Sequence, residues 1–283
     1  MSTLLLLLSS LCHQAEGVIV KKYNEKYAGG NFIFTAFFAF FSMLFFVITH
    51  NGGYNFSWQI VPYAVIAGIL YSGSSFLCFV AYGCGSFVLS KLILSYSIVI
   101  TIGYGLIFLK EPVSVFAYIG LIIMIMSIYL SNGKNRSKKK FSVKWLICIM
   151  LSAIGSGLFG VIQRIQQIKF NNSTTNEFMI ITLGFAFISF LIIGLIMDGK
   201  NFGHTFKRGV PYAALAGISN GATNFLMLYV YTLIPISIAS PSNAGIEIII
   251  SFILSKLIFK EVFTKSQVVS VMLGVIAVVL LNI

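Results

Sequence analysis

Charged side chains are scarce in this sequence of 283 residues. They make up 9% of the chain, against 58% hydrophobic residues, whereas a soluble domain carries roughly 25% charged residues. This is too little polar surface to cover the apolar surface in water, so the chain is predicted to be solvated by lipid. Because a backbone in lipid must satisfy its own hydrogen bonds, the predicted fold class is an all-α integral membrane protein.

Acidic residues are rarer still. The sequence has seven Asp and Glu and 19 Lys and Arg, which gives a formal net charge of +12. Most of the cations lie in short loops between apolar runs, where Lys and Arg fix helix orientation and contact anionic lipid headgroups. Membrane lipid is therefore an expected partner, and nucleic acid is not.

Several catalytic signatures are missing as well. The sequence has no HExxH motif, its single aspartate is Asp198, and no phosphate-binding glycine-rich motif is present, which excludes an ATP-driven pump in this chain. Its four cysteines all lie in apolar segments without metal-ligand spacing. We expect no metal, no cofactor and no enzymatic activity, and an intramembrane enzyme is the weaker alternative.

The sequence contains apolar runs that approach or exceed the roughly 20 residues needed to cross about 30 Å of hydrocarbon as a helix. The first run lacks the basic start and small-residue cleavage site of a signal peptide, so it is predicted to be a transmembrane helix. About ten spans are predicted, at residues 3–20, 31–49, 59–82, 85–109, 113–131, 143–163, 177–197, 209–232, 235–259 and 264–282.

The two halves of the chain resemble each other in sequence. Residues 61–82 and 210–231 are identical at ten of 22 aligned positions, and the segment LIFLKEPVS (106–114) aligns with KLIFKEVFT (256–264). The predicted domains are two five-helix repeats, 1–131 and 143–283, joined by a basic linker at 132–142. An odd number of crossings per repeat inverts the second copy, which gives the 5+5 inverted repeat of many secondary transporters.

These repeats, the Lys-Glu turns before the fifth helices (Lys110-Glu111 and Lys260-Glu261) and the glycine in each fifth helix resemble the EamA family of the drug/metabolite transporter superfamily. The resemblance implies a carrier whose central cavity is lined largely by the first, third and fourth helices of each half. It implies a small-molecule substrate such as an amino acid, sugar, nucleobase or drug-like solute. One chain holds both halves, so a monomer is sufficient and a homodimer is possible.

The first predicted helix carries two ionisable residues on one face, His13 and Glu16. The segment QAEGVIVKK (14–22) resembles the Ala-Glu segment of small multidrug resistance proteins, in which that Glu exchanges protons for substrate. The resemblance implies proton coupling at Glu16, with His13 as a relay or substrate partner. The alternative is that both residues anchor the helix end and pair with Lys21 or Lys22.

Polar pairs at i and i+4 occur on four further predicted helices. Such residues share a helical face, and buried polar groups in a membrane usually face a cavity or a partner. If Lys91 and Glu247 share a cavity, one of them would bind the charged group of the substrate and the other would balance its charge. Alternatively, the Lys91 side chain extends to the nearer membrane interface. The candidate cavity residues are Lys91 with Ser95, Asn243 with Glu247, Asn220 with Asn224, and Tyr71 with Ser75 at the repeat positions that match the two asparagines.

We predict a secondary transporter of a small metabolite, proton-coupled and working by alternating access, in the plasma membrane. A non-transporting membrane partner or sensor on the same fold is the alternative. Orientation is left open, because the Lys and Arg bias places both termini outside whereas the family resemblance implies cytoplasmic termini.

Overall fold

The computed structural model describes residues 2–27, 31–50, 55–108, 114–131, 142–171, 173–199, 202–233 and 236–280. Within these ranges the chain forms helices and turns and no strand, which confirms the all-α prediction. The helices are α1 (Ser2–Lys26), α2 (Asn31–Thr49), η1 (Trp58–Ile60), α3 (Val61–Cys84), α4 (Phe87–Ser95), α5 (Ile98–Ile107), α6 (Val115–Ser131), α7 (Val143–Lys169), α8 (Thr175–Met197), α9 (Phe202–Leu233), α10 (Ile236–Ile258) and α11 (Lys265–Leu280).

Five helical segments in the described residues are long and apolar enough to cross a membrane: Thr3–Lys26, Phe32–Thr49, Trp58–Cys84, Val143–Lys169 and Thr175–Met197. Helix α9 is longer, at 32 residues, but its polar side chains, Asn220 and Asn224 among them, dilute its hydropathy. The count of ten spans therefore stays a prediction. The predicted linker, apart from Ser142, and the pair Lys110-Glu111 lie outside the described residues.

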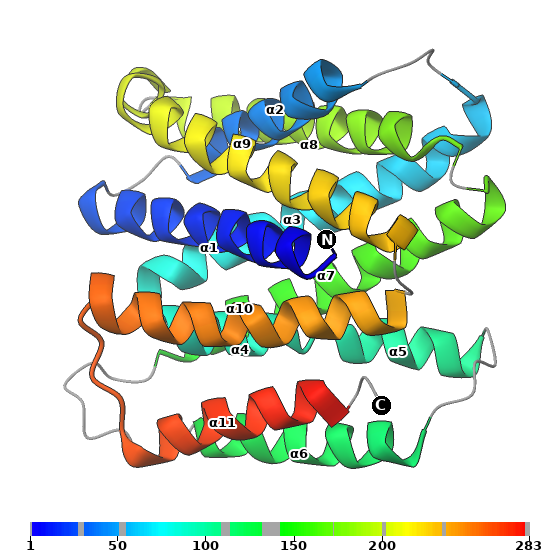
Figure 1. Ribbon diagram of the computed structural model, residues 1–283. Helices are drawn as coiled ribbons and strands as arrows, with labels where there is room; N and C mark the ends of the chain where they lie inside the picture. The colour runs from blue at the N-terminus through cyan, green and yellow to red at the C-terminus, as the bar shows by residue number, and fades with distance from the viewer. Residues whose placement is uncertain are drawn as a thin grey trace.

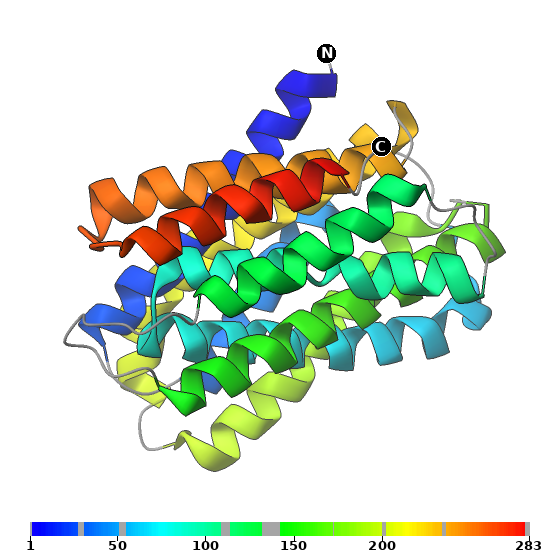
Figure 2. The same ribbon diagram turned by 90° about the horizontal axis from the view of Figure 1, so that it is seen from below.

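The helices pack side by side with their axes roughly aligned (Figures 1 and 2). Helices α6 and α11 pair along one edge of the bundle, and α2, α8 and α9 pack together at the opposite edge. Between these edges, α1 packs on α3, α9 and α10, while α7 packs on α3, α4 and α5. Helix α1 begins and α11 ends on the same side of the bundle (Figure 1).

The predicted span 85–109 is not one continuous helix. It is interrupted between α4 and α5, where the Tyr96 and Ser97 amides donate to the carbonyls three residues back, on Ile93 and Leu94. The Ser95 hydroxyl also donates to Leu92 O at 2.7 Å. Hydrogen bonds to residue i−3 tighten the backbone into a 3-10 turn, and a serine hydroxyl that competes for a carbonyl bends a helix. These local bonds explain why the single-helix prediction was wrong here.

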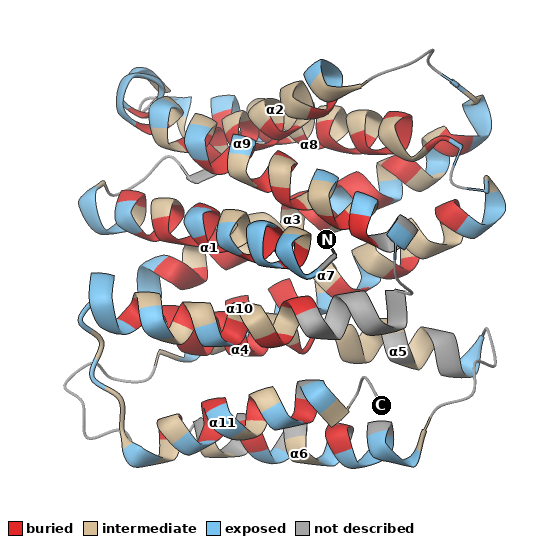
Figure 3. Ribbon diagram, in the orientation of Figure 1, coloured by how far each residue is buried: buried red, intermediate tan, exposed pale blue. Residues whose placement is uncertain are grey.

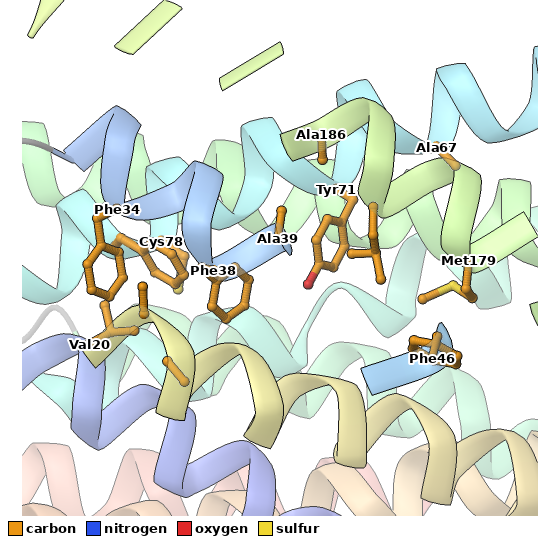
Figure 4. Packing of buried hydrophobic residues seen from close by; sticks show 14 of the residues in the cluster. Val20, Phe34, Phe38, Ala39, Phe46, Ala67, Tyr71, Cys78, Met179 and Ala186 are labelled. Atoms are coloured by element: carbon orange, nitrogen blue, oxygen red, sulfur yellow. The ribbon is translucent and has the colours of Figure 1, made fainter. Parts of the chain in front are cut away.

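The core is packed from aromatic and small side chains. Phe34, Phe38 and Phe79 are at most 2% exposed and belong to the largest buried cluster, which also contains Tyr71. Phe34, Phe38 and Tyr71 lie along this cluster in Figure 4. In contrast, large apolar side chains such as Ile196 are exposed, here at 78%. Figure 3 shows exposed residues distributed over the helices of the bundle. An apolar exterior is expected where lipid is the solvent.

Two glycines allow helices to approach closely. A Cβ added at Gly217 on α9 would lie 2.5 Å from Phe38 O on α2, and one added at Gly68 on α3 would lie 2.9 Å from Thr182 O on α8. Small residues at such crossings are typical of helix association in membranes, where van der Waals packing replaces the hydrophobic effect.

Reciprocal hydroxyl bonds cross two other helix pairs. Between α3 and α7, Ser74 Oγ donates to Ser152 O at 2.9 Å and Ser152 Oγ donates to Ser74 O at 2.8 Å. Between α1 and α9, Ser9 Oγ donates to Thr223 O at 3.4 Å and Thr223 Oγ1 donates to Ser9 O at 3.5 Å. The Ser74–Ser152 exchange satisfies two hydroxyl donors that lipid could not satisfy, whereas the Thr223 hydroxyl has a nearer acceptor in its own helix, Ser219 O at 2.8 Å.

Substitution at Gly217 is expected to destabilise the bundle. Gly217→Ala forces the α2 and α9 backbones apart, and overpacking of this kind costs about 1–3 kcal/mol, so the thermal unfolding midpoint in detergent should fall. The matched control is Gly73→Ala, because a Cβ at Gly73 meets nothing within 4 Å. Equal midpoints for the two variants would contradict the close approach of α2 and α9.

Candidate substrate and coupling site

Most of the polar residues predicted for the site lie in two adjoining networks between α1, α3, α4, α9 and α10. Their backbones are positioned by helix packing, because α1 contacts α3, α9 and α10, and α4 contacts α10. Buried polar groups in such a place must find partners within the protein. The partners distinguish one network around Glu247 from a second around Asn220.

Glu247 on α10 is the centre of the first network. Its Oε1 atom lies 2.8 Å from His13 Nδ1 on α1 and 2.6 Å from Asn243 Nδ2, one turn back on α10. Asn243 in turn accepts a bond from Ser10 Oγ at 2.8 Å. The Glu247 side chain is 12% exposed and that of His13 is 33% exposed. A carboxylate hydrogen-bonded to an imidazole in this way can hold and pass a proton.

Lys91 on α4 is buried beside the same network, at 4% exposed. Its ammonium donates to His13 O at 3.3 Å and acts electrostatically on Glu247. The side chain therefore does not extend to the membrane interface, as one interpretation of the sequence had it. Instead Lys91 supplies positive charge next to Glu247, which offsets part of the cost of burying a carboxylate.

Asn220 on α9 is the centre of the second network. Its Nδ2 donates to Glu16 Oε2 at 2.9 Å, and its Oδ1 accepts from Tyr71 OH at 2.6 Å. Asn224 Nδ2 donates to Asn220 O at 2.9 Å and to Asn220 Oδ1 at 3.1 Å. Glu16 is 8% exposed. Glu16 thus bonds to an asparagine of the other half of the chain and not to Lys21 or Lys22, the partners that the anchoring interpretation expected.

Three residues in these networks were not singled out from the sequence. Gln14 is fully buried and donates through Nε2 to Glu247 O at 3.1 Å, while its Oε1 atom has no hydrogen-bond partner. Ser10 extends the first network, and Ser42 on α2 donates to Asn220 Oδ1 at 3.3 Å. Gln14 directly follows His13 in the sequence, so its place in a run of polar residues was a signal that could have identified it. Ser42 has no such signal.

Within the part of the chain that the structure describes, two of the predicted site residues, Ser95 and Ser75, form no hydrogen bond with the residues of the first network. Ser95 was predicted to share a site with Lys91, but its hydroxyl bonds to Leu92 O in its own helix. Ser75 interacts with the Tyr71 side chain and so adjoins the second network. His13 and Glu16 share helix α1 but serve different networks, since His13 contacts Glu247 and Glu16 contacts Asn220.

A third polar cluster lies where α1 meets the loop after α10. Lys21 Nζ donates to Glu261 Oε1 at 2.5 Å, and the same carboxylate accepts bonds from Ser86, Ser255 and the Phe87 backbone amide. Burial raises the pKa of the Glu261 carboxyl, but Lys21 and the hydroxyl donors outweigh burial, so this pKa lies below its ordinary value. Glu261 is therefore ionised at neutral pH. From the sequence, Lys260-Glu261 was identified only as a Lys-Glu turn before the last helix.

One segment of α9 matches the GxSxG pattern of serine hydrolases, Gly217 to Gly221. In those enzymes the serine lies on a sharp turn between a strand and a helix. Here Ser219 lies within α9, and its hydroxyl donates to Leu215 O in the same helix at 2.8 Å. The pattern is therefore no nucleophile elbow.

The comparisons with known proteins agree with this arrangement of helices. A solved structure described only as the crystal structure of a protein matches with a TM-score of 0.56 and 11% identity, over 99% of this chain and 95% of that one. No curated protein matches the sequence. The model of the EamA-like transporter family matches residues 143–283, the second half of the chain. With its apolar helices and this family match, the chain belongs to the EamA-like transporters, a family of membrane transporters of the drug/metabolite type.

Proposed function

We propose that this chain is a proton-coupled secondary carrier of a small metabolite that works by alternating access in the plasma membrane. The observation that carries the proposal is the pair of carboxylates held inside the helix bundle: Glu16, which accepts a hydrogen bond from Asn220, and Glu247, which is bonded to His13. Ionisable groups are expensive within a membrane and mark substrate or proton pathways. The substrate class is an amino acid, sugar, nucleobase or drug-like solute.

The proposal includes the ten-span 5+5 inverted repeat, with repeats 1–131 and 143–283 and a linker at 132–142. The glycine contacts support it. Gly68 meets Thr182 and Phe185, and Gly217 meets Phe38 and Phe41. Each glycine therefore meets two residues spaced three apart on the second helix of the other repeat, as a two-fold exchange of the halves requires.

The reciprocal hydroxyl bonds support the same exchange. Ser74 and Thr223 occupy matching positions of the repeated segments 61–82 and 210–231, and they bond to Ser152 and Ser9 respectively. Ser9 and Ser152 are thus counterparts on the first helix of each half. Counting seven residues onward from each gives Glu16 in the first repeat and Phe159 in the second.

The functional residues are not duplicated along with the backbone. Glu16 bonds to Asn220, whereas their counterparts Phe159 and Tyr71 form an apolar ring contact with centroids 5.3 Å apart. The Tyr71 hydroxyl nevertheless reaches Asn220. Because Tyr71 and Asn220 are counterparts that contact each other, Asn220 and its partner Glu16 lie close to the interface of the two repeats, where carriers of this architecture bind substrate.

The deciding experiment is counterflow in proteoliposomes, with solute panels of amino acids, sugars, nucleobases and organic cations at pH 6 to 8. We expect one class to exchange and its rate to depend on pH, because a proton that binds Glu16 competes with the hydrogen bond that Glu16 Oε2 accepts from Asn220. Glu16→Gln should retain exchange but lose the pH dependence. Glu25→Gln, an exposed acid on the same helix, is the matched control.

Failure of every solute class to exchange, with the protein folded and reconstituted, would favour a non-transporting membrane partner or sensor. Equal pH profiles for wild type and Glu16→Gln would instead keep the carrier and remove Glu16 as its proton site.

A further inference from the structure

The Lys21–Glu261 cluster joins elements that are far apart in the sequence. Glu261 follows α10, Lys21 is on α1, and Ser86 and Phe87 are at the start of α4. All of these groups converge on the two oxygens of one carboxylate, at distances of 2.5 to 2.9 Å. Loss of that single charge would release three helices at once.

This cluster lies at one end of the same helices that hold the Glu247 network. Eight residues separate His13 from Lys21 on α1, and eight separate Glu247 from Ser255 on α10. At 1.5 Å rise per helical residue, each separation is about 12 Å. Because the first network and the cluster are spanned by the same pair of helices, movement of α1 against α10 changes both.

Aromatic rings cover the ion pair. Lys21 Nζ lies 4.2 Å from the centroid of the Phe259 ring and 5.8 Å from that of Phe87, and the two rings lie 5.3 Å apart. The Lys21 and Glu261 side chains are only 6% and 17% exposed. Rings of this size, packed between α1, α4 and the end of α10, leave water little access to the interior from this end.

We propose that Lys21, Glu261, Ser86 and the Phe87–Phe259 pair form the closed gate at one end of the substrate pathway, and that this end opens when Glu261 leaves Lys21 and the start of α4. The inference rests on the proposed carrier function, since a gate needs a pathway. The gate is driven by helix movement and not by titration between pH 6 and 8. In that range Glu261 keeps its charge, because the ammonium of Lys21 and the hydroxyls of Ser86 and Ser255 all face it.

The test measures access to a cysteine placed between the gate and the Glu247 network. Ser251 is suited because it is fully buried on α10, one turn from both Glu247 and Ser255. Ser251→Cys is made in a background in which the native cysteines are replaced by serine or alanine. A charged, membrane-impermeant methanethiosulfonate is then added to either face of sealed vesicles, and the labelling rate is measured.

Glu261→Gln should raise the labelling rate at least about tenfold from one face only, because the rate follows the population of the open gate. Ser86→Ala removes one hydrogen bond and should give a smaller increase from the same face, which keeps the test usable if Glu261→Gln folds poorly. Glu25→Gln and Lys22→Gln alter exposed charges on α1 and should leave the rate unchanged.

An unchanged rate in Glu261→Gln, or an equal increase from both faces, would overturn the gate and leave the cluster as a fixed anchor. These outcomes are independent of transport. One-sided labelling without counterflow of any solute would retain the gating motion and refute the carrier. Counterflow of a solute with an unchanged labelling rate would support the carrier and refute the gate.

Discussion

Glu247→Gln is expected to reduce counterflow about ten- to hundredfold. Glu247 Oε1 accepts hydrogen bonds from His13 and Asn243, and a hydrogen bond to a charged group contributes about 1.5–3 kcal/mol. The amide retains the shape of the side chain but removes the charge that the site presents to substrate or proton. Initial rates in proteoliposomes measure the loss, with Glu25→Gln as the control.

The same substitution is expected to destabilise the protein, and a second one to restore it. Without Glu247 the buried Lys91 ammonium loses the negative charge that acts on it electrostatically, and a buried charge without compensation is destabilising. Lys91→Met in the Glu247→Gln background should raise the unfolding midpoint back towards wild type without restoring transport. A double variant no more stable than the single one would show that Lys91 and Glu247 do not compensate each other.

Asn220→Leu is expected to have the second large effect. It leaves the buried Glu16 Oε2 atom without its partner, and an unpaired buried group costs about 1–3 kcal/mol. It also removes one partner of the Tyr71 hydroxyl, which keeps Ser42 and Ser75. The unfolding midpoint should fall sharply, and exchange should be lost.

Two further variants separate the effects. Asn224→Leu removes a side chain whose bonds run back to Asn220 on the same helix, so its effect should be smaller. Glu16→Gln in the Asn220→Leu background removes the charge of the unpaired carboxylate and should recover part of the stability. If Asn224→Leu is as damaging as Asn220→Leu, Asn220 is not the centre of the second network.

Much of the fold was accessible from the sequence because composition decides it. The chain has too few charged residues to cover its apolar surface in water, so its solvent is lipid. A backbone in lipid satisfies its own hydrogen bonds by forming helices. Pairs within one helix were equally accessible: the i, i+4 spacing of Asn243 and Glu247 predicted a shared face, and the two side chains are bonded at 2.6 Å. The break between α4 and α5 was missed because it depends on the conformations of Ser95 and its neighbours and not on hydropathy.

Contacts between helices were not accessible in the same way. Glu16 and Asn220 are 204 positions apart, and hydropathy does not state which faces of α1 and α9 meet. The ion pair of Lys21 and Glu261 was missed for the same reason, since a Lys-Glu turn looks like an interface anchor until α1 is packed beside it. Pairing across the repeats is a tertiary property, and only the packed helices reveal it.

The unequal counterparts of Glu16 and Asn220 have a consequence for the energetics of the transport cycle. If opening to the opposite side exchanges the conformations of the two repeats, the backbone returns to an equivalent shape, but a carboxylate–amide contact takes the place of one between two aromatic rings. In the proposed alternating-access cycle, the inward-open and outward-open states would therefore have different free energies even without substrate. The empty carrier would then have a preferred resting side, to which the unequal Glu16–Asn220 and Phe159–Tyr71 contacts contribute.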